Sequence, residues 1–203
     1  MTVRPSVFVC YTHDSPWHKQ QVLDFCTFLV AAGIEVCVDQ WQPPERQDWY
    51  RWALDKIPSA DFVLAIASPE FREAADGRVP AERNRGAQAE ATVLRELLQD
   101  DRPMWTKRIL PVVLPGRAVE EIPMFLQPRT ADHYIVESFT EEGAEYLLSA
   151  LRRAPSRPTP AHRAKPVPPP KPHPSSGNVQ HIVSNGSGSV YANQGGEQTI
   201  HHR

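Results

Sequence analysis

The chain has 203 residues, 21 of them proline, and a formal net charge of −2. Nine prolines fall between Ala154 and Pro174, so a folded core must lie mainly in the first 153 residues, enough for one well-buried domain. Those 153 residues carry a net charge of −6, and an acidic surface argues against nucleic acid as a partner. No apolar run approaches the roughly 20 residues of a membrane span, and the N-terminus lacks a signal-peptide stretch.

The cysteines are odd in number and lie in apolar segments. Cys10, Cys26 and Cys37 are therefore expected to be reduced, buried thiols of a cytoplasmic protein. Their spacing does not match a zinc-binding pattern, so no metal site is expected.

The first half of this domain alternates strand and helix patterns. Residues 7–11 form a nearly continuous apolar run, typical of a strand buried on both faces. Residues 17–32 carry apolar side chains at helical spacing and end before a glycine, which helix ends favour. A second strand is predicted over 34–39, and then a helix over 46–57 that Pro58 ends.

The second half continues the alternation. Its predicted elements are a strand over 62–67, a helix over 86–99, strands over 109–114 and 133–136, and a helix over 141–153. Pro111 inside the fourth strand indicates an edge strand or a bulge, because proline cannot donate to the ladder. Thr140 is the expected N-cap of the last helix.

Five strands joined by helical segments predict parallel pairing with right-handed crossovers. About 150 residues suit a five-stranded, flavodoxin-like α/β sheet with helices on both faces, whereas an eight-fold barrel needs about 250. In open sheets of this kind, ligands bind at the carboxyl ends of the strands. The loops that follow the strands are therefore the place to look for a site, namely 11–17, 39–48, 68–85 and 115–124.

Two further segments follow the domain at 1–153. Residues 154–174 are predicted to be an extended, cationic, proline-rich linker, because proline removes donors and fixes φ. Residues 175–203 contain no proline and hold five of the ten glycines. Their two β-prone, low-charge patches, 178–183 and 189–194, are of the kind that stacks into cross-β fibres. A plain flexible tail is the alternative.

Four blocks of the domain resemble a SEFIR domain: VFVCYTHDSPWHKQQV, GIEVCVDQWQ, DWYRWALDKIPSADFVLAIASPEFRE and RILPVVLP. The resemblance spans about residues 5–150. SEFIR domains are the cytoplasmic signalling domains of a class of interleukin receptors, are also found in bacteria, and are akin to TIR domains. The resemblance implies one of two functions: cleavage of NAD, or a non-enzymatic adaptor that associates with its own kind.

The NAD-cleaving TIR-like domains use one glutamate on the helix after the third strand. The resemblance carries this role to Glu90, where a carboxylate can stabilise the oxocarbenium-like centre left by nicotinamide. The alternative is an exposed helix acid, as expected for Glu96. The Trp-Cys pair that usually precedes this glutamate is replaced by Ala87 and Gln88, and a polar insertion over 74–85 lengthens the connection.

With NAD as substrate and no bound cofactor expected, other residues of the strand-end loops are candidates for binding it. They are Tyr11, His13, Asp14, Trp41 and Ser68. The first three are assigned to the ribose side, and His13 is not expected to pair with the adjacent Asp14, since neighbouring side chains diverge. Trp41 is preferred over Trp49 and Trp52 for stacking on a base. Ser68 either donates to phosphate or caps a helix.

The tail from Asn178 to Ile200 resembles the short amyloid-forming motifs of bacterial defence and cell-death effectors, which are similar to RHIM motifs. The residues expected to drive assembly are Val179, Ile182, Val190, Tyr191, Asn193, Gln194, Gly195 and Ile200. The order of domain, linker and motif implies an immune effector. An NLR-type partner with a matching motif would template the tail, and the tethered SEFIR domains would self-associate at high effective concentration.

Overall fold

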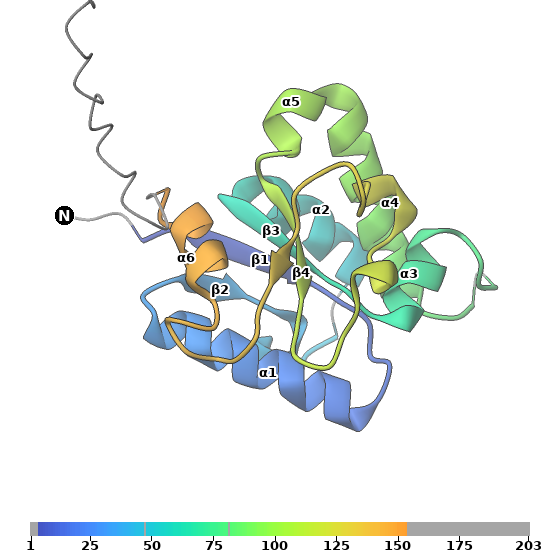
Figure 1. Cartoon of the computed structure of the whole chain (residues 1–203). Coiled ribbons are helices and arrows are strands. Elements are labelled where there is room, and N and C mark those ends of the chain that lie inside the picture. Colours follow the sequence, from blue (N-terminus) through green and yellow to red (C-terminus); the bar gives the residue numbers. More distant parts are fainter. Residues whose placement is uncertain (1–3, 47, 81, 154–203) are drawn as a thin grey trace, which may run out of the picture. The chain divides into compact units, whose positions relative to one another are not determined.

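The apolar runs form five strands in the computed structural model, which describes residues 4–46, 48–80 and 82–153. They are β1 (Ser6–Cys10), β2 (Glu35–Cys37), β3 (Phe62–Ile66), β4 (Ile109–Val113) and β5 (Tyr134–Ile135). All pairings are parallel, in the order β2-β1-β3-β4-β5 (Figure 1). This is the order of flavodoxin-like sheets, so the predicted fold class is confirmed.

One face of the sheet packs against two helices, α1 (Pro16–Ala31) and α6 (Glu145–Leu151). Strand side chains alternate between faces, and Val7 and Val9 of β1 join this core. Gly33 follows α1 with φ +85°, the left-handed conformation predicted from the sequence.

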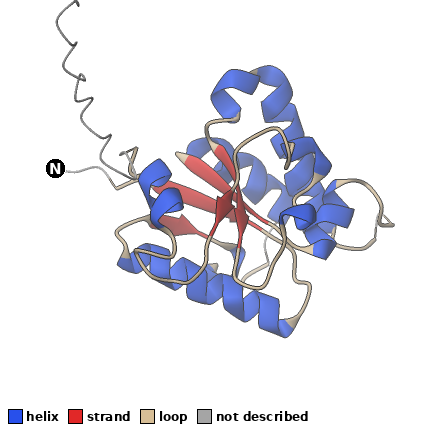
Figure 2. Ribbon diagram, viewed as in Figure 1, coloured by secondary structure: helices blue, strands red, loops and turns tan. Residues whose placement is uncertain are grey.

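The opposite face packs against α2 (Trp49–Ser59), α3 (Pro69–Ala75) and α4 (Arg85–Asp100). Phe8 and Cys10 of β1 point into this second core. Figure 2 shows the resulting three layers, with the sheet between helices on both sides. The end of β1 therefore sends successive side chains to opposite faces, which matters for the site.

The connections hold several short elements that the sequence did not predict. The segment 68–85, expected as a loop, contains α3, whose first turn is capped by Ser68 and begins with Pro69. A four-residue helix, α5 (Arg102–Trp105), precedes β4. Three 3₁₀ turns complete the described part of the chain: η1 (Asp39–Trp41), η2 (Val119–Glu121) and η3 (Met124–Leu126).

Pro58 does not end α2 as predicted, because the helix continues to Ser59. A proline near the end of a helix removes one backbone hydrogen bond, and here the side chain of Arg108 stabilises that end instead. Its Nη2 donates to the carbonyl oxygens of Pro58, at 3.1 Å, and of Ala60.

The prediction of an edge strand or bulge at Pro111 is wrong, because β4 lies between β3 and β5 and its register with β3 continues without a bulge through Pro111. The carbonyl oxygens of Arg108 and Val112 accept hydrogen bonds from backbone N–H groups on the β3 side. Pro111 is one residue out of phase with Val112, so its nitrogen points away from β3. On that side β5 begins only opposite Val112. Proline is tolerated there because no ladder hydrogen bond is lost.

The last helix is shorter than predicted. It spans Glu145–Leu151, and Thr140 instead accepts a hydrogen bond from the backbone N–H of Gly143 in the preceding turn.

Cys10 and Cys26 are buried, Cys37 is partly buried, and all three are free thiols. The predicted linker at 154–174 and the predicted assembly motif at 175–203 lie outside the described residues.

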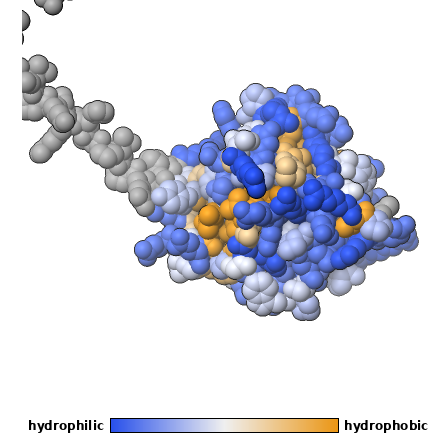
Figure 3. Space-filling view, turned by 45° about the vertical axis from the view of Figure 1, so that its right-hand side comes forward, coloured by the Kyte–Doolittle hydropathy of each residue, from blue (hydrophilic) through white to orange (hydrophobic). Residues whose placement is uncertain are grey.

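The surface is mainly hydrophilic on the face shown in Figure 3, where hydrophobic residues gather in separate patches. Among the described residues, none of the helices has both the length and the apolar character needed to cross a bilayer.

Candidate active site

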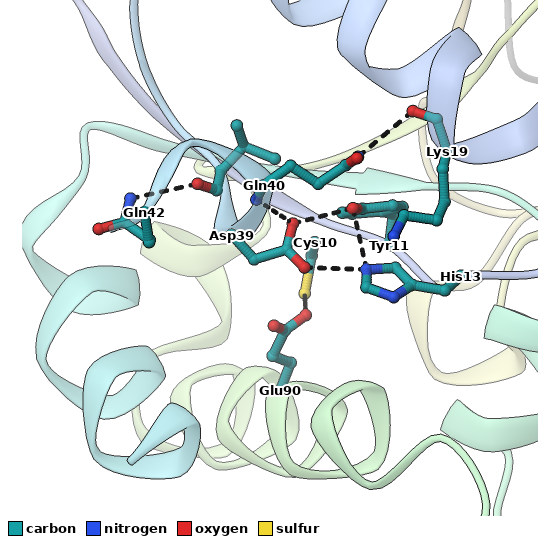
Figure 4. A network of polar contacts seen from close by, with 9 residues as sticks. Cys10, Tyr11, His13, Lys19, Asp39, Gln40, Gln42 and Glu90 are labelled. Carbon is teal, nitrogen blue, oxygen red and sulfur yellow. Dashed lines mark hydrogen bonds and ion pairs between the residues drawn. The ribbon is translucent and has the colours of Figure 1, made fainter. Parts of the chain in front are cut away.

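Two polar networks meet at the carboxyl ends of β1 and β2, the edge of the sheet where the fold favours ligand binding (Figure 4). One joins Cys10 to Glu90 of α4. The other joins Tyr11, His13 and Asp39. Cys10 and Tyr11 are consecutive, so the alternation at the end of β1 directs the two networks to opposite faces of the sheet.

Glu90 reaches from α4 toward the end of β1. The Cys10 thiol lies 2.7 Å from Glu90 Oε2 and donates to it. Glu90 is partly exposed, whereas Cys10 is fully buried. By contrast, Glu96 on the same helix is exposed, as the sequence predicted. The carboxyl of Glu90 is thus held in place at the strand end rather than extended into solvent.

Glu90 and Cys10 both have pKa values above their ordinary ranges, which favours the neutral form of each. Burial raises the pKa of Glu90 to about 8, the Cys10 hydrogen bond acts in the opposite direction, and the negative charge of Asp39 raises it further. Burial, together with the charges and hydrogen bond of its acidic neighbours, raises the pKa of the Cys10 thiol well above its ordinary value. The thiol is therefore a hydrogen-bond donor here, not a nucleophile.

Asp39 is the centre of the second network. Its Oδ1 accepts from the Tyr11 hydroxyl at 2.8 Å and from the Gln40 backbone N–H at 2.7 Å, and its Oδ2 lies 2.9 Å from His13 Nε2. Burial alone would raise the pKa of Asp39, but the hydrogen bonds from His13 and Tyr11 outweigh it and lower that pKa. Asp39 is therefore a fixed carboxylate.

Tyr11 and His13 differ in what they can offer a ligand. Tyr11 is buried, and burial together with the adjacent Asp39 charge raises the pKa of its hydroxyl, which stays protonated and bonded to Asp39. The side chain of His13 is 49% exposed. Of the two, His13 is the residue that can contact a substrate.

Asp14 and Ser68 hydrogen-bond to each other, so their polar groups are not directed at a ligand. Ser68 is fully buried, donates to Asp14 Oδ1 at 2.9 Å and accepts from the Phe71 backbone N–H at 3.2 Å. Asp14 also accepts from the hydroxyl of Thr12 and from the backbone N–H of Glu70. Of the two roles the sequence left open for Ser68, helix capping is the one its contacts show. Asp14 links the loop after β1 to the start of α3.

The three tryptophans near the second strand have different surroundings. Trp41 in η1 and Trp49 at the start of α2 are exposed. Trp52 packs on Phe8 of the core, with ring centroids 5.0 Å apart, and meets Trp49 edge-on at 5.6 Å. Trp41, the preferred stacking residue, lies directly after Asp39 and Gln40 and is free to contact a ligand or another protein.

Two hollows of the described surface lie away from these networks. One of about 170 Å³ is lined by Ile109 and Tyr134, at the amino ends of β4 and β5. Another, of about 610 Å³, lies beside Arg108 and Arg153. Neither is lined by Glu90 or by a residue of the two networks. In the part of the chain that the structure describes, no group of three or more His, Cys, Asp or Glu residues is placed to hold a metal ion.

The sequence named Tyr11, His13 and Glu90 as candidates, and the structure brings them to one strand end together with Asp39 and Cys10, which the sequence did not single out. A signal for Asp39 was present, because it is an acidic residue directly after a strand whose carboxyl end faces the expected crevice. Nothing in the sequence marked Cys10, which has the pattern of an ordinary core residue.

Comparisons with known proteins agree with this architecture. A family model described as SEFIR domain matches residues 5–141. Among solved structures, one described as a prokaryotic SEFIR domain superposes with a TM-score of 0.56 at 24% sequence identity, over 77% of this chain and 97% of that one. At 24% identity, this similarity supports the fold alone. No curated protein shows significant similarity to the chain.

Proposed function

Since this chain belongs to the SEFIR domain family, a family of TIR-like signalling domains, we propose that it cleaves the N-glycosidic bond of NAD when several chains cluster. The observation that carries the proposal is Glu90, whose carboxyl extends from α4 to the carboxyl end of β1 and is held there by Cys10.

The charge state of Glu90 suits this reaction. The pKa of about 8 keeps the carboxyl neutral in the free protein. A bound nicotinamide ribosyl group brings a positive charge, and an adjacent opposite charge lowers the pKa of a carboxyl. Substrate therefore ionises Glu90, and the carboxylate then stabilises the positive charge that spreads onto the ribose as the bond to nicotinamide breaks.

Two features support clustering. Glu90 does not line either of the two hollows described above, and a neighbouring domain would complete a pocket around it. The tail at 175–203 supplies a means of assembly, through the β-prone patches around Ile182 and Tyr191. An NLR-type receptor with a matching motif would start the assembly.

The test is release of nicotinamide from NAD by the full-length chain, with and without forced clustering through a fused inducible oligomerisation domain. We expect clustering to switch on turnover and Glu90→Gln to reduce it by about 100-fold or more. Glu96→Gln, an exposed acid on the same helix, is the matched control and should have no effect. Gly195→Pro should abolish activity that depends on the tail but not activity under forced clustering. If clustered wild-type chain leaves NAD intact, or Glu90→Gln cleaves as fast, the proposal fails.

A second candidate function is a non-enzymatic adaptor that binds other SEFIR domains. The observation that favours it is the set of exposed aromatic rings at η1 and the start of α2, Trp41, Trp49 and Tyr50. Exposed aromatics of this kind are enriched where proteins bind each other. In this case Trp49→Ala abolishes signalling in cells, whereas Glu90→Gln signals normally.

A further inference from the structure

We infer that His13 acts as the general base of the proposed NAD cleavage and that Asp39 is the residue that positions it. The inference rests on the proposed function and adds a second group to Glu90. What carries it is a half-exposed imidazole at the end of β1, fixed through one nitrogen by a carboxylate from the end of β2.

The network assigns the tautomer of His13. Asp39 is a carboxylate and can only accept, and the Tyr11 hydroxyl gives its proton to Asp39 Oδ1. The Tyr11 oxygen also lies 3.0 Å from His13 Nε2. Both neighbours are satisfied only if Nε2 carries a proton and donates it to Asp39 Oδ2. The proton of neutral His13 is therefore on Nε2, which leaves the Nδ1 lone pair free.

Nδ1 faces away from the network. No described residue hydrogen-bonds to it, and in Figure 4 it lies on the far side of the ring from Asp39 and Tyr11. With the side chain 49% exposed, this nitrogen is open to water. A base fixed on one side by a carboxylate and open on the other has the geometry for taking a proton from an attacking nucleophile.

His13 and Glu90 approach the carboxyl end of β1 from opposite faces of the sheet. Glu90 is bonded to Cys10, and His13 is bonded to Tyr11, the next residue along the chain. The negative charge of Asp39 raises the pKa of both Cys10 and Glu90, so the two networks are close enough to interact electrostatically. In the proposed complex, a nucleotide lies across the end of β1 and contacts both residues.

The chemistry balances without a further reactant. The bond from ribose C1′ to nicotinamide breaks, its electron pair leaves with neutral nicotinamide, and Glu90 stabilises the positive ribosyl centre. A water oxygen then bonds to C1′ while His13 Nδ1 takes one of its protons. Asp39 stabilises the imidazolium that results, and the proton is later released to solvent.

A partition experiment separates this role from a structural one. When a pyridine replaces water as the acceptor, its nitrogen attacks C1′ with no proton to remove. We expect His13→Ala in the full-length, clustered chain to lose hydrolysis by about 100-fold, while exchange of nicotinamide for 3-acetylpyridine changes less than about threefold. Asp39→Asn should show the same split in weaker form. His133→Ala, next to β5 at the opposite edge of the sheet, is the control.

Because His13 is exposed, added imidazole should restore part of the hydrolysis lost in His13→Ala. If His13→Ala lowers hydrolysis and exchange equally, or lowers neither, the base role is overturned while the NAD-cleaving function stands. If wild-type chain catalyses neither hydrolysis nor exchange, the proposed function itself is overturned and the base role with it.

Discussion

Two consecutive residues at the end of β1 lead to networks of opposite character. Cys10 lies in the core beneath α2 and α4, and its partner Glu90 is neutral because burial raises its pKa to about 8. Tyr11 lies on the α1 side, and its partner Asp39 is a carboxylate whose pKa is lowered by hydrogen bonds. The two acids approach the same strand end in different charge states.

The difference comes from the number of donors each carboxyl receives. Glu90 has one weak donor, a thiol, while Asp39 has a phenol, an imidazole and a backbone N–H. Hydrogen bonds to the charged form favour it, and burial without them favours the neutral form. The strand end therefore holds one fixed charge and one carboxyl whose pKa is raised.

Removing Asp39 should have the largest effect on stability. Asp39→Ala leaves the buried Tyr11 hydroxyl without its acceptor, and we expect the free energy of unfolding to fall by about 3 kcal/mol. Urea denaturation of the full-length chain measures this. Tyr11→Phe removes one hydrogen bond of the same network and should cost about 1 kcal/mol. Equal midpoints for wild type and Asp39→Ala would contradict the network.

The two acids should also respond to pH in opposite directions. Because the folded pKa of Asp39 is lowered, its contribution to the free energy of unfolding is present above the ordinary aspartate pKa and is lost as pH falls from there through the lower folded pKa. Because the folded pKa of Glu90 is raised, its contribution is present at acid pH and is lost as pH rises from the ordinary glutamate range to about 8.

Glu90→Gln should remove the loss of stability with rising pH that the raised pKa of Glu90 causes. We expect wild type to lose about 2 kcal/mol of unfolding free energy between pH 6 and pH 8, somewhat less than the linkage limit for a fully buried group. Burial lowers the pKa of His18, so its contribution rises with pH in the same window and is common to all variants. The readout is therefore the difference from wild type: the profile of Glu90→Gln should lack the fall due to Glu90, and Glu96→Gln should follow wild type. A wild-type profile that parallels Glu90→Gln would mean that Glu90 is ionised in the free protein.

The sequence predicted the strands well because each is a short apolar run between turn residues. It predicted α3 poorly, since a seven-residue helix is too short for a clear periodic pattern and only the Ser68-Pro69 start signal marks it. The loop residues Tyr11 and His13 were found because they directly follow the first predicted strand. Their location at a strand end was therefore predictable.

The partner of His13 was not predictable in the same way. It is Asp39 and not the adjacent Asp14, because the register pairs Phe8 with Cys37 and so brings Asp39 beside the end of β1. Register depends on the hydrophobic pattern, and the nearly continuous apolar run of β1, which is buried on both faces, does not single out one register. The pairing of Cys10 with Glu90 depends in the same way on where α4 crosses the sheet.

The smallest effect expected is on the pKa of Glu90 when its one donor is changed. The Cys10 thiol lowers that pKa relative to burial alone, so Cys10→Ala should raise it and Cys10→Ser, a stronger donor, should lower it. Carboxyl carbon NMR of the side chain during a pH titration measures the shift. Cys26→Ala, a buried thiol in the opposite core, is the control and should leave the titration unchanged. If both Cys10 variants titrate like wild type, the hydrogen bond contributes nothing to the charge state of Glu90, and burial alone raises the pKa of its carboxyl.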